Sequence, residues 1–156
     1  MYQHILAPID GSETSLCALK AAIQIARDNG AELVPLYVID IPLLSYDAPD
    51  VDPSTALKAF KEEGERLKAD SLAAMQRENV KGMPHVVELV VPGSDTAQRI
   101  LEEAQAIHAD LVVMGTHGRR GFKRFALGGV TERFMRMAPC HVLLVPSSVE
   151  SHGTAA

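Results

Sequence analysis

Five short apolar runs alternate along the chain with four longer segments in which apolar residues recur every three or four positions. The runs are continuous, as is typical of strands that are buried on both faces of a sheet. They cover residues 4–9, 31–39, 83–91, 110–115 and 139–145. Strands that alternate with helices predict parallel pairing through right-handed crossovers. We therefore expect an α/β fold: a Rossmann-like, open, five-stranded parallel sheet with helices on both faces.

The four intervening segments carry the signals of amphipathic helices. The first, residues 13–29, follows the N-cap candidate Ser12 and ends at Gly30. The second, residues 54–79, has one apolar stripe and one face of lysines and glutamates. Ser94 is the N-cap candidate for the third helix, and the fourth begins at Val130. Residues 41–53 contain three prolines and predict the longest irregular loop of the chain.

Length and composition limit the class of protein. The chain has 156 residues, of which 47% are hydrophobic, and we predict one domain over residues 1–146 with a flexible C-terminal tail over residues 147–156. The net charge of −5 argues against nucleic acid as a partner. No apolar run approaches the ~20 residues of a membrane span, and the N-terminus leads into a strand without a signal-peptide pattern. A cytoplasmic protein with no membrane partner is the expectation.

The turn after the fourth strand is rich in glycine. Gly115, Gly118 and Gly121 follow the apolar run, and a Gly128-Gly129 pair precedes the fourth helix. A glycine-rich turn that opens a helix exposes backbone N–H groups and the positive end of the helix dipole, which together favour anions. The turn is neither the Walker phosphate loop nor the Gly-x-Gly-x-x-Gly dinucleotide fingerprint. It predicts a phosphate cradle, and a plain surface loop with glycines for turn geometry is the alternative.

The same turn carries basic side chains, namely Arg119, Arg120, Lys123 and Arg124. They are either solvated loop charges or partners for the β- and γ-phosphates, a task that a divalent cation would share. His117 also lies in this turn, where a solvent-facing position is the simpler interpretation. The histidines of the chain lack the spacing of metal ligands, so no metal-binding residue is predicted.

Three stretches together resemble the nucleotide-binding branch of the universal stress proteins. That branch has a strand ending in Gly, then Gly-x-x-Gly, nine residues, and Gly-Ser or Gly-Thr; here Gly115 and Gly118 are followed by residues 119–127 and then Gly128. The opening Ile-Leu-Ala-Pro-Ile-Asp-Gly-Ser and the closing Pro-Cys-His-Val-Leu-Leu-Val-Pro are similar to the first and last strands of that family. The resemblance covers residues 2–146 and implies an adenine nucleotide α-hydrolase-like fold.

The resemblance also implies an adenine-nucleotide site. Pro8 and Asp10 match positions beside the adenine and the ribose, and Val38 matches a position that touches adenine. The full set of expected site residues is Ala7, Pro8, Asp10, Val38, Met114, Gly115, Gly118, Arg119, Gly128, Gly129, Val130 and Thr131. Asp10 offers an acceptor to ribose hydroxyls, and Thr131 offers a hydroxyl donor near the helix start. The family has serine or threonine at Gly129, so a hydrogen bond of about 0.5–1.5 kcal/mol is missing and weaker binding is expected.

The function implied by the resemblance is that of an ATP-binding protein, with Mg²⁺ or Mn²⁺ bound through the phosphates, which acts as a dimeric regulatory or sensor module in stress response. In the homodimer, the last strand, from Cys140 to Val145, would pair with the same strand of the second copy. The backbone groups at the outer edge of this strand are otherwise unpaired, and such an edge must be covered or paired. An unidentified regulatory protein is a further partner. Two alternatives stay open: a dimeric scaffold that has lost nucleotide binding, for which Gly129 is the argument, and a slow ATP hydrolase with Asp10 as its base.

Overall fold

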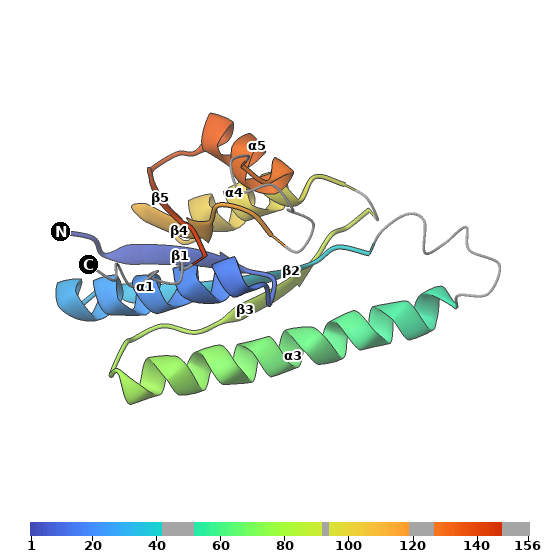
Figure 1. Cartoon of the computed structure of the whole chain (residues 1–156), viewed down its shortest axis with the longest axis horizontal. Coiled ribbons are helices and arrows are strands. Elements are labelled where there is room, and N and C mark those ends of the chain that lie inside the picture. The colour runs from blue at the N-terminus through green and yellow to red at the C-terminus, as the bar shows by residue number, and fades with distance from the viewer. Residues whose placement is uncertain (42–51, 92–93, 119–126, 148–156) are drawn as a thin grey trace, which may run out of the picture.

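Five parallel strands form one sheet in the computed structural model, which describes residues 1–41, 52–91, 94–118 and 127–147 (Figure 1). The strands are β1 (His4–Ile9), β2 (Glu32–Ile39), β3 (His85–Glu88), β4 (Leu111–Gly115) and β5 (His141–Val145). Their spatial order is β3-β2-β1-β4-β5, and every neighbouring pair is parallel. The predicted fold class is confirmed.

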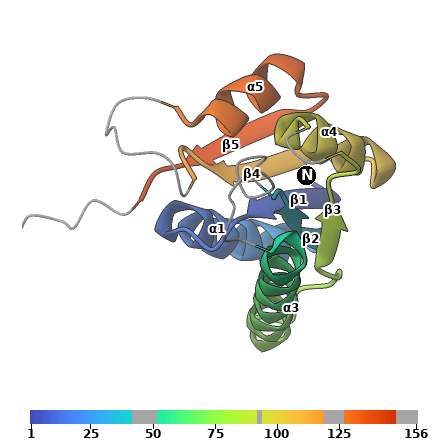
Figure 2. The same cartoon turned by 90° about the vertical axis from the view of Figure 1, so that its right-hand side faces the viewer.

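Helices cover both faces of the sheet, as the strand pattern predicts (Figure 2). One face carries α1 (Glu13–Asn29) and α3 (Pro53–Arg77), and the other carries α4 (Thr96–Ala106) and α5 (Gly129–Met137). Ile5 belongs to the apolar cluster of the first face and its neighbour Leu6 to that of the second, because successive side chains of a strand point to opposite faces. Within the described residues, no helix combines the length and the apolar character needed to cross a bilayer.

The helices α3, α4 and α5 begin at residues other than those predicted. α3 begins at Pro53, and its N-cap is Asp52, whose carboxylate accepts hydrogen bonds from the N–H of Ser54 at 3.0 Å and from its hydroxyl at 2.6 Å. These bonds hold the pKa of Asp52 below its usual value. Proline suits the first helical position because its φ is preset and its missing N–H needs no acceptor. α4 is capped by Asp95 and not by Ser94. Residues 42–51 of the predicted loop lie outside the described residues.

The third strand is shorter than the run of apolar residues predicts. β3 ends at Glu88, which pairs with Ile39, the last residue of β2. Among the described residues, no partner strand continues beyond this pair, and Val90 and Val91 are 94% and 60% exposed. An apolar run therefore predicts the existence of this strand correctly and its length wrongly.

The strand order places a topological switch beside β1, the central strand. β2 and β3 lie on one side of it, and β4 and β5 lie on the other. The chain therefore crosses over in opposite directions after β1 and before β4. In parallel sheets of this type, ligands bind outside the carboxyl ends of the strands at such a point.

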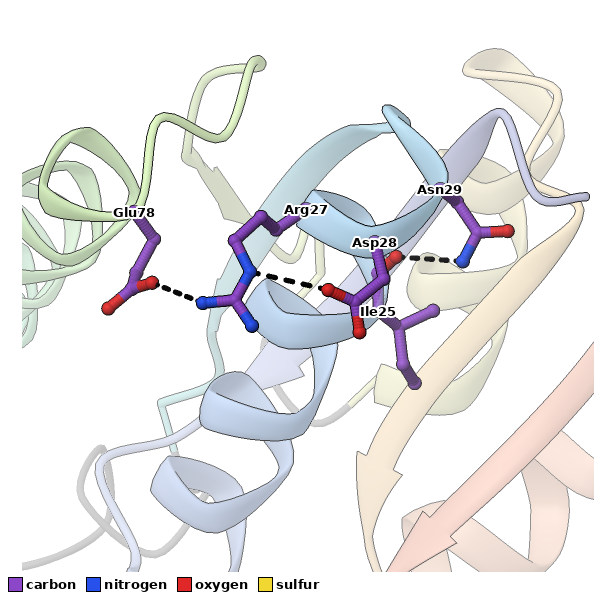
Figure 3. A network of polar contacts seen from close by, with 5 residues as sticks. All are labelled: Ile25, Arg27, Asp28, Asn29 and Glu78. Carbon is purple, nitrogen blue, oxygen red and sulfur yellow. Dashed lines mark hydrogen bonds and ion pairs between the residues drawn. The ribbon is translucent and has the colours of Figure 1, made fainter.

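The amino end of the sheet is closed by polar contacts between segments that are far apart in the chain. The Asp110 carboxylate accepts hydrogen bonds from the N–H groups of Gln3, at 2.7 Å, and His4, at 3.1 Å. On the same rim, Arg27 near the end of α1 forms an ion pair of 2.7 Å with Glu78, which follows α3 (Figure 3). These contacts tie β1 to β4 and α1 to α3.

Candidate functional site

A cleft of about 580 Å³ opens at the carboxyl end of the sheet. Strands β1, β2 and β4 contribute to its lining, together with residues of α1, α3, α4 and α5. Ten of the twelve expected site residues line it: Pro8, Asp10, Val38, Met114, Gly115, Gly118, Gly128, Gly129, Val130 and Thr131. The motifs and the resemblance predict that these residues lie together. They come from the ends of β1, β2 and β4 and from the start of α5, and they line a single cleft.

The other two expected residues are Ala7 and Arg119. Ala7 is fully buried and packs in the apolar cluster under α1, because its side chain and that of Pro8 point to opposite faces of β1. Arg119 lies outside the described residues, as do Arg120, Lys123 and Arg124.

Asp10 follows β1 and is held by the start of α1. Its Oδ1 accepts hydrogen bonds from the N–H of Ser12, at 2.9 Å, and from the Ser12 hydroxyl, at 2.5 Å. Ser12 is also the N-cap of α1, as predicted, and accepts from the N–H of Ser15 at 3.3 Å. The turn passes through Gly11, whose φ of 80° favours glycine. The carboxylate of Asp10 is thus oriented at the cleft by a tight turn.

The turns after β1 and β4 touch one another because glycines leave no side chain between them. The Thr14 hydroxyl donates a hydrogen bond to the carbonyl oxygen of His117. A Cβ atom on Gly115 would lie 3.0 Å from the Cβ of Thr14, and one on Gly118 would lie 2.5 Å from Oδ2 of Asp10. Glycine at these positions therefore leaves room for the two turns to approach each other, before any ligand is considered.

The start of α5 forms a third side of the cleft. α5 begins at Gly129, one residue before the predicted start, with Gly128 as its N-cap and no side-chain cap. The first N–H groups of a helix have no acceptor within the helix. Among the described residues, nothing lies within 4 Å of the place that a Cβ atom on Gly129 would take. The backbone here can approach an anion closely.

Thr131 has a different place from the one expected for a ligand-binding hydroxyl. Its side chain lines the cleft, but its hydroxyl donates to the carbonyl oxygen of Gly115 at 2.9 Å, and the residue is buried. The proton of this hydroxyl therefore links α5 to β4 within the fold. A contact of Thr131 with a ligand stays a prediction.

A further wall of the cleft comes from β2, α3 and α4 and contains side chains that the sequence motifs do not indicate. They are Tyr37, Asp40, Phe60, Thr96 and Ile100. The position of Asp40 after the second strand is a usable signal, because the carboxyl ends of parallel strands meet at one edge. Phe60 and Ile100 belong to apolar stripes that read as core positions, so only the packing of the helices brings them to the cleft.

Imidazole and carboxylate groups are among the side chains that bind metal ions in proteins. His117 lines the cleft, and its Nδ1 lies 3.1 Å from the hydroxyl oxygen of Thr116. Within residues 1–41, 52–91, 94–118 and 127–147, no group of three or more His, Cys, Asp or Glu side chains is arranged to hold a metal ion.

Comparison with known proteins gives a consistent result over most of the chain. The model of the universal stress protein family matches residues 1–146. A universal stress protein of Methanocaldococcus jannaschii is 36% identical over 146 residues, which are 93% of this chain and 82% of that protein. The crystal structure of a universal stress protein family member from Burkholderia pseudomallei is 42% identical, with a TM-score of 0.77, and the match covers 93% of this chain and 96% of that one.

More distant structures share the fold and were solved with a nucleotide. One is a universal stress protein in complex with cAMP, which is 22% identical, with a TM-score of 0.64 over 94% of this chain and 98% of that one. Another is the protein from Archaeoglobus fulgidus in complex with dAMP, which is 18% identical, with a TM-score of 0.63 over 92% of this chain and 98% of that one. On the family match and the two closer relatives, the chain belongs to the universal stress protein family.

Proposed function

We propose that this protein is a cytoplasmic ATP-binding module that works as a homodimer and regulates a stress response through an unidentified protein partner. The observation that carries the proposal is the cleft at the carboxyl end of the sheet, where two glycine-containing turns and a helix start without a side-chain cap surround one space. Members of the family that share this fold have been solved with cAMP and with dAMP.

The residues around the cleft fit the three parts of an adenine nucleotide. Pro8, Val38 and Met114 supply apolar surface for the base, and the Asp10 carboxylate supplies an acceptor for ribose hydroxyls. Gly118 and the N-terminal backbone of α5 would bind the phosphates through N–H groups and the helix dipole. Mg²⁺ or Mn²⁺ would be bound through the phosphates, which carry the charge that the cation neutralises.

Bound nucleotide is the direct test. Freshly purified protein is denatured, the supernatant is analysed for nucleotide, and the emptied and refolded protein is titrated with ATP and Mg²⁺ by calorimetry. We expect released adenine nucleotide or a saturable binding heat. Neither release nor heat at millimolar ATP would refute the proposal and would favour a scaffold that has lost nucleotide binding. Analysis of the ATP after long incubation separates binding from slow hydrolysis to ADP.

The proposed dimer pairs β5 of two copies. β5 is the last strand of the sheet order, and Leu143 on it is 38% exposed. Sedimentation should give the mass of two chains for the wild type and of one chain for Leu143→Asp, because a carboxylate buried at a strand-to-strand interface is costly. Val90→Asp is the matched control, since Val90 is exposed beyond the opposite edge strand. A Leu143→Asp variant that stays dimeric would exclude β5 as the interface.

A further inference from the structure

We infer that the ion pair between Asp95 of the α4 start and Arg133 of α5 fixes the first turn of α5 at the cleft. Both residues then position the backbone N–H groups that are proposed to bind phosphate. The inference rests on the proposed function, because it concerns the same cleft. It assigns a role to two residues that do not line the cleft and that neither the motifs nor the resemblance indicates.

The start of α5 is built differently from the starts of the other helices. α1, α3 and α4 each follow an N-cap residue whose side chain accepts a hydrogen bond from a backbone N–H. α5 follows Gly128, which has no side chain to make such a bond. An uncapped start leaves its N–H groups available to an anion. The position of the first turn must then be fixed by contacts with other elements.

Two hydrogen bonds tie this first turn to the end of β4. The Thr131 hydroxyl donates to the carbonyl oxygen of Gly115 at 2.9 Å, and the N–H of Gly128 donates to the carbonyl oxygen of Thr116 at 2.8 Å. Both bonds reach the same segment of the chain. They leave the position of α5 against α4 to other contacts.

The ion pair supplies a directional contact between α5 and α4. Asp95 is the N-cap of α4, and its Oδ1 accepts from the N–H of Ala97 at 3.0 Å. Its Oδ2 lies 2.5 Å from Nη2 of Arg133. One oxygen thus fixes the carboxylate on α4, and the other presents it to α5. The side chains of Asp95 and Arg133 are 27% and 63% exposed, so the contribution of the pair is limited by solvent.

The residue after Asp95 continues the connection to the other side of the cleft. The Thr96 hydroxyl donates to Oδ2 of Asp40, which follows β2, at 3.0 Å. β2 and β4 lie on opposite sides of β1, and Asp40 and Gly129 both line the cleft. The start of α4 therefore bridges the two sides of the cleft. The pair between Asp95 and Arg133 is its link on the α5 side.

A second arginine of α5 provides the comparison. Arg136 pairs with Glu132 of the same helix at 2.7 Å, and these side chains are 76% and 52% exposed. This pair can stabilise the helix, but it joins α5 to no other element. Arg136 therefore carries the same charge as Arg133 without the link to α4.

The first test compares ATP with adenosine by calorimetry on the full chain. Without the pair, a fraction of the molecules should lose the arrangement of the first turn that binds phosphate, and the apparent affinity falls by that fraction. Arg133→Met should weaken ATP binding between about twofold and fivefold, which is the upper range of exposed ion pairs. Adenosine affinity should not change, and Arg133→Lys should restore most of the loss. Arg136→Met is the matched control and should bind both ligands as the wild type does.

The second test uses Asp95→Asn, for which charge and position predict opposite signs. Asparagine caps a helix as well as aspartate, so the start of α4 is kept, but its neutral amide no longer forms the ion pair. Loss of a negative charge near the cleft would by itself tighten the binding of anionic ATP. Loss of the link to α5 should instead weaken it, to the same extent as Arg133→Met. The double variant should be no weaker than either single variant, because both remove one interaction.

Circular dichroism checks that each variant keeps the fold. Three results would overturn the inference and leave the proposed function standing: tighter ATP binding in Asp95→Asn, equal losses for ATP and adenosine in Arg133→Met, or the same loss of ATP affinity in Arg136→Met. A wild type that binds neither ATP nor adenosine would refute the proposed function and the inference with it.

Discussion

The two rims of the sheet use the same residue types for different purposes. At the amino rim, the carboxylate of Asp110 accepts from two backbone N–H groups of the first strand. At the carboxyl rim, the carboxylate of Asp10 is oriented by Ser12 and lines the cleft. The first aspartate joins two segments of the fold, and the second is presented at a space that a ligand can enter. The comparison teaches that the contacts of the amino rim hold the fold together, whereas the carboxyl rim carries the proposed binding cleft.

Glycines differ between the rims in the same way. Gly30, which ends α1, has a φ of 66°, and a Cβ there would meet nothing within 4 Å. Its requirement is conformational, since only glycine adopts the left-handed region without strain. For Gly118, by contrast, a Cβ would meet the Asp10 carboxylate at 2.5 Å. Its requirement is space, and the consequences of substitution should differ accordingly.

The largest expected effect is on binding, at Gly118. Gly118→Val places a branched side chain against Asp10 and should separate the two turns, which removes the ribose and phosphate contacts together. We expect ATP affinity to fall more than a hundredfold, which corresponds to about 3 kcal/mol or more, with calorimetry as the measurement. Gly129→Ala, at the first residue of α5, is the control and should bind ATP within a fewfold of the wild type, because no described residue lies within 4 Å of the added methyl. Unchanged affinity in Gly118→Val would place the cradle elsewhere.

The amino rim should show the opposite behaviour at Asp110. Asp110→Ala leaves two N–H groups of the first strand without their acceptor and should lower the free energy of unfolding by about 2 kcal/mol. ATP affinity should not change, because the cleft is at the other end of the sheet. Urea denaturation and calorimetry measure the two quantities. Asp110→Asn keeps one acceptor and should lose less stability; a variant that loses affinity but not stability would break the distinction between the rims.

A smaller loss of stability is expected for Gly30→Ala. The added methyl meets no neighbour, so the cost is only that of the left-handed backbone, about 1 kcal/mol. Thermal denaturation should detect this change, and ATP affinity should stay the same. If the loss approached that of Asp110→Ala, a packing role for Gly30 would have to replace the conformational one.

The smallest effect, and the only gain, is expected at Gly129. No described residue would obstruct a serine side chain there, and its hydroxyl would donate to a phosphate oxygen of the proposed ligand. Gly129→Ser should strengthen ATP binding between about twofold and tenfold, which is the range of one neutral hydrogen bond. The gain should be absent with adenosine, which has no phosphate. If adenosine also bound more tightly to Gly129→Ser, the gain would come from a change in α5 and not from a hydrogen bond to the phosphates.

Much of the fold was predictable because its signals are local. The continuous apolar runs predict the five strands, and the Ser12 cap and the Gly30 stop predict the limits of α1. The spacing of Gly115, Gly118 and Gly128 locates the turn that meets the start of α1. Where prediction fails, a contact with a distant segment decides: the apolar residues Val90 and Val91 are exposed because β2 has already ended.

The sequence by itself therefore determined the order of strands and helices, the parallel sheet and the glycine turn at its carboxyl end. These depend on periodicity, capping and turn geometry over a few residues. Only the tertiary structure decided that the Thr131 hydroxyl donates to the carbonyl oxygen of Gly115. It also decided that Asp40, Phe60 and Thr96 line the same cleft. Those outcomes depend on strand order and on the packing of helices against the sheet, which bring together residues whose separation in the chain carries no local signal.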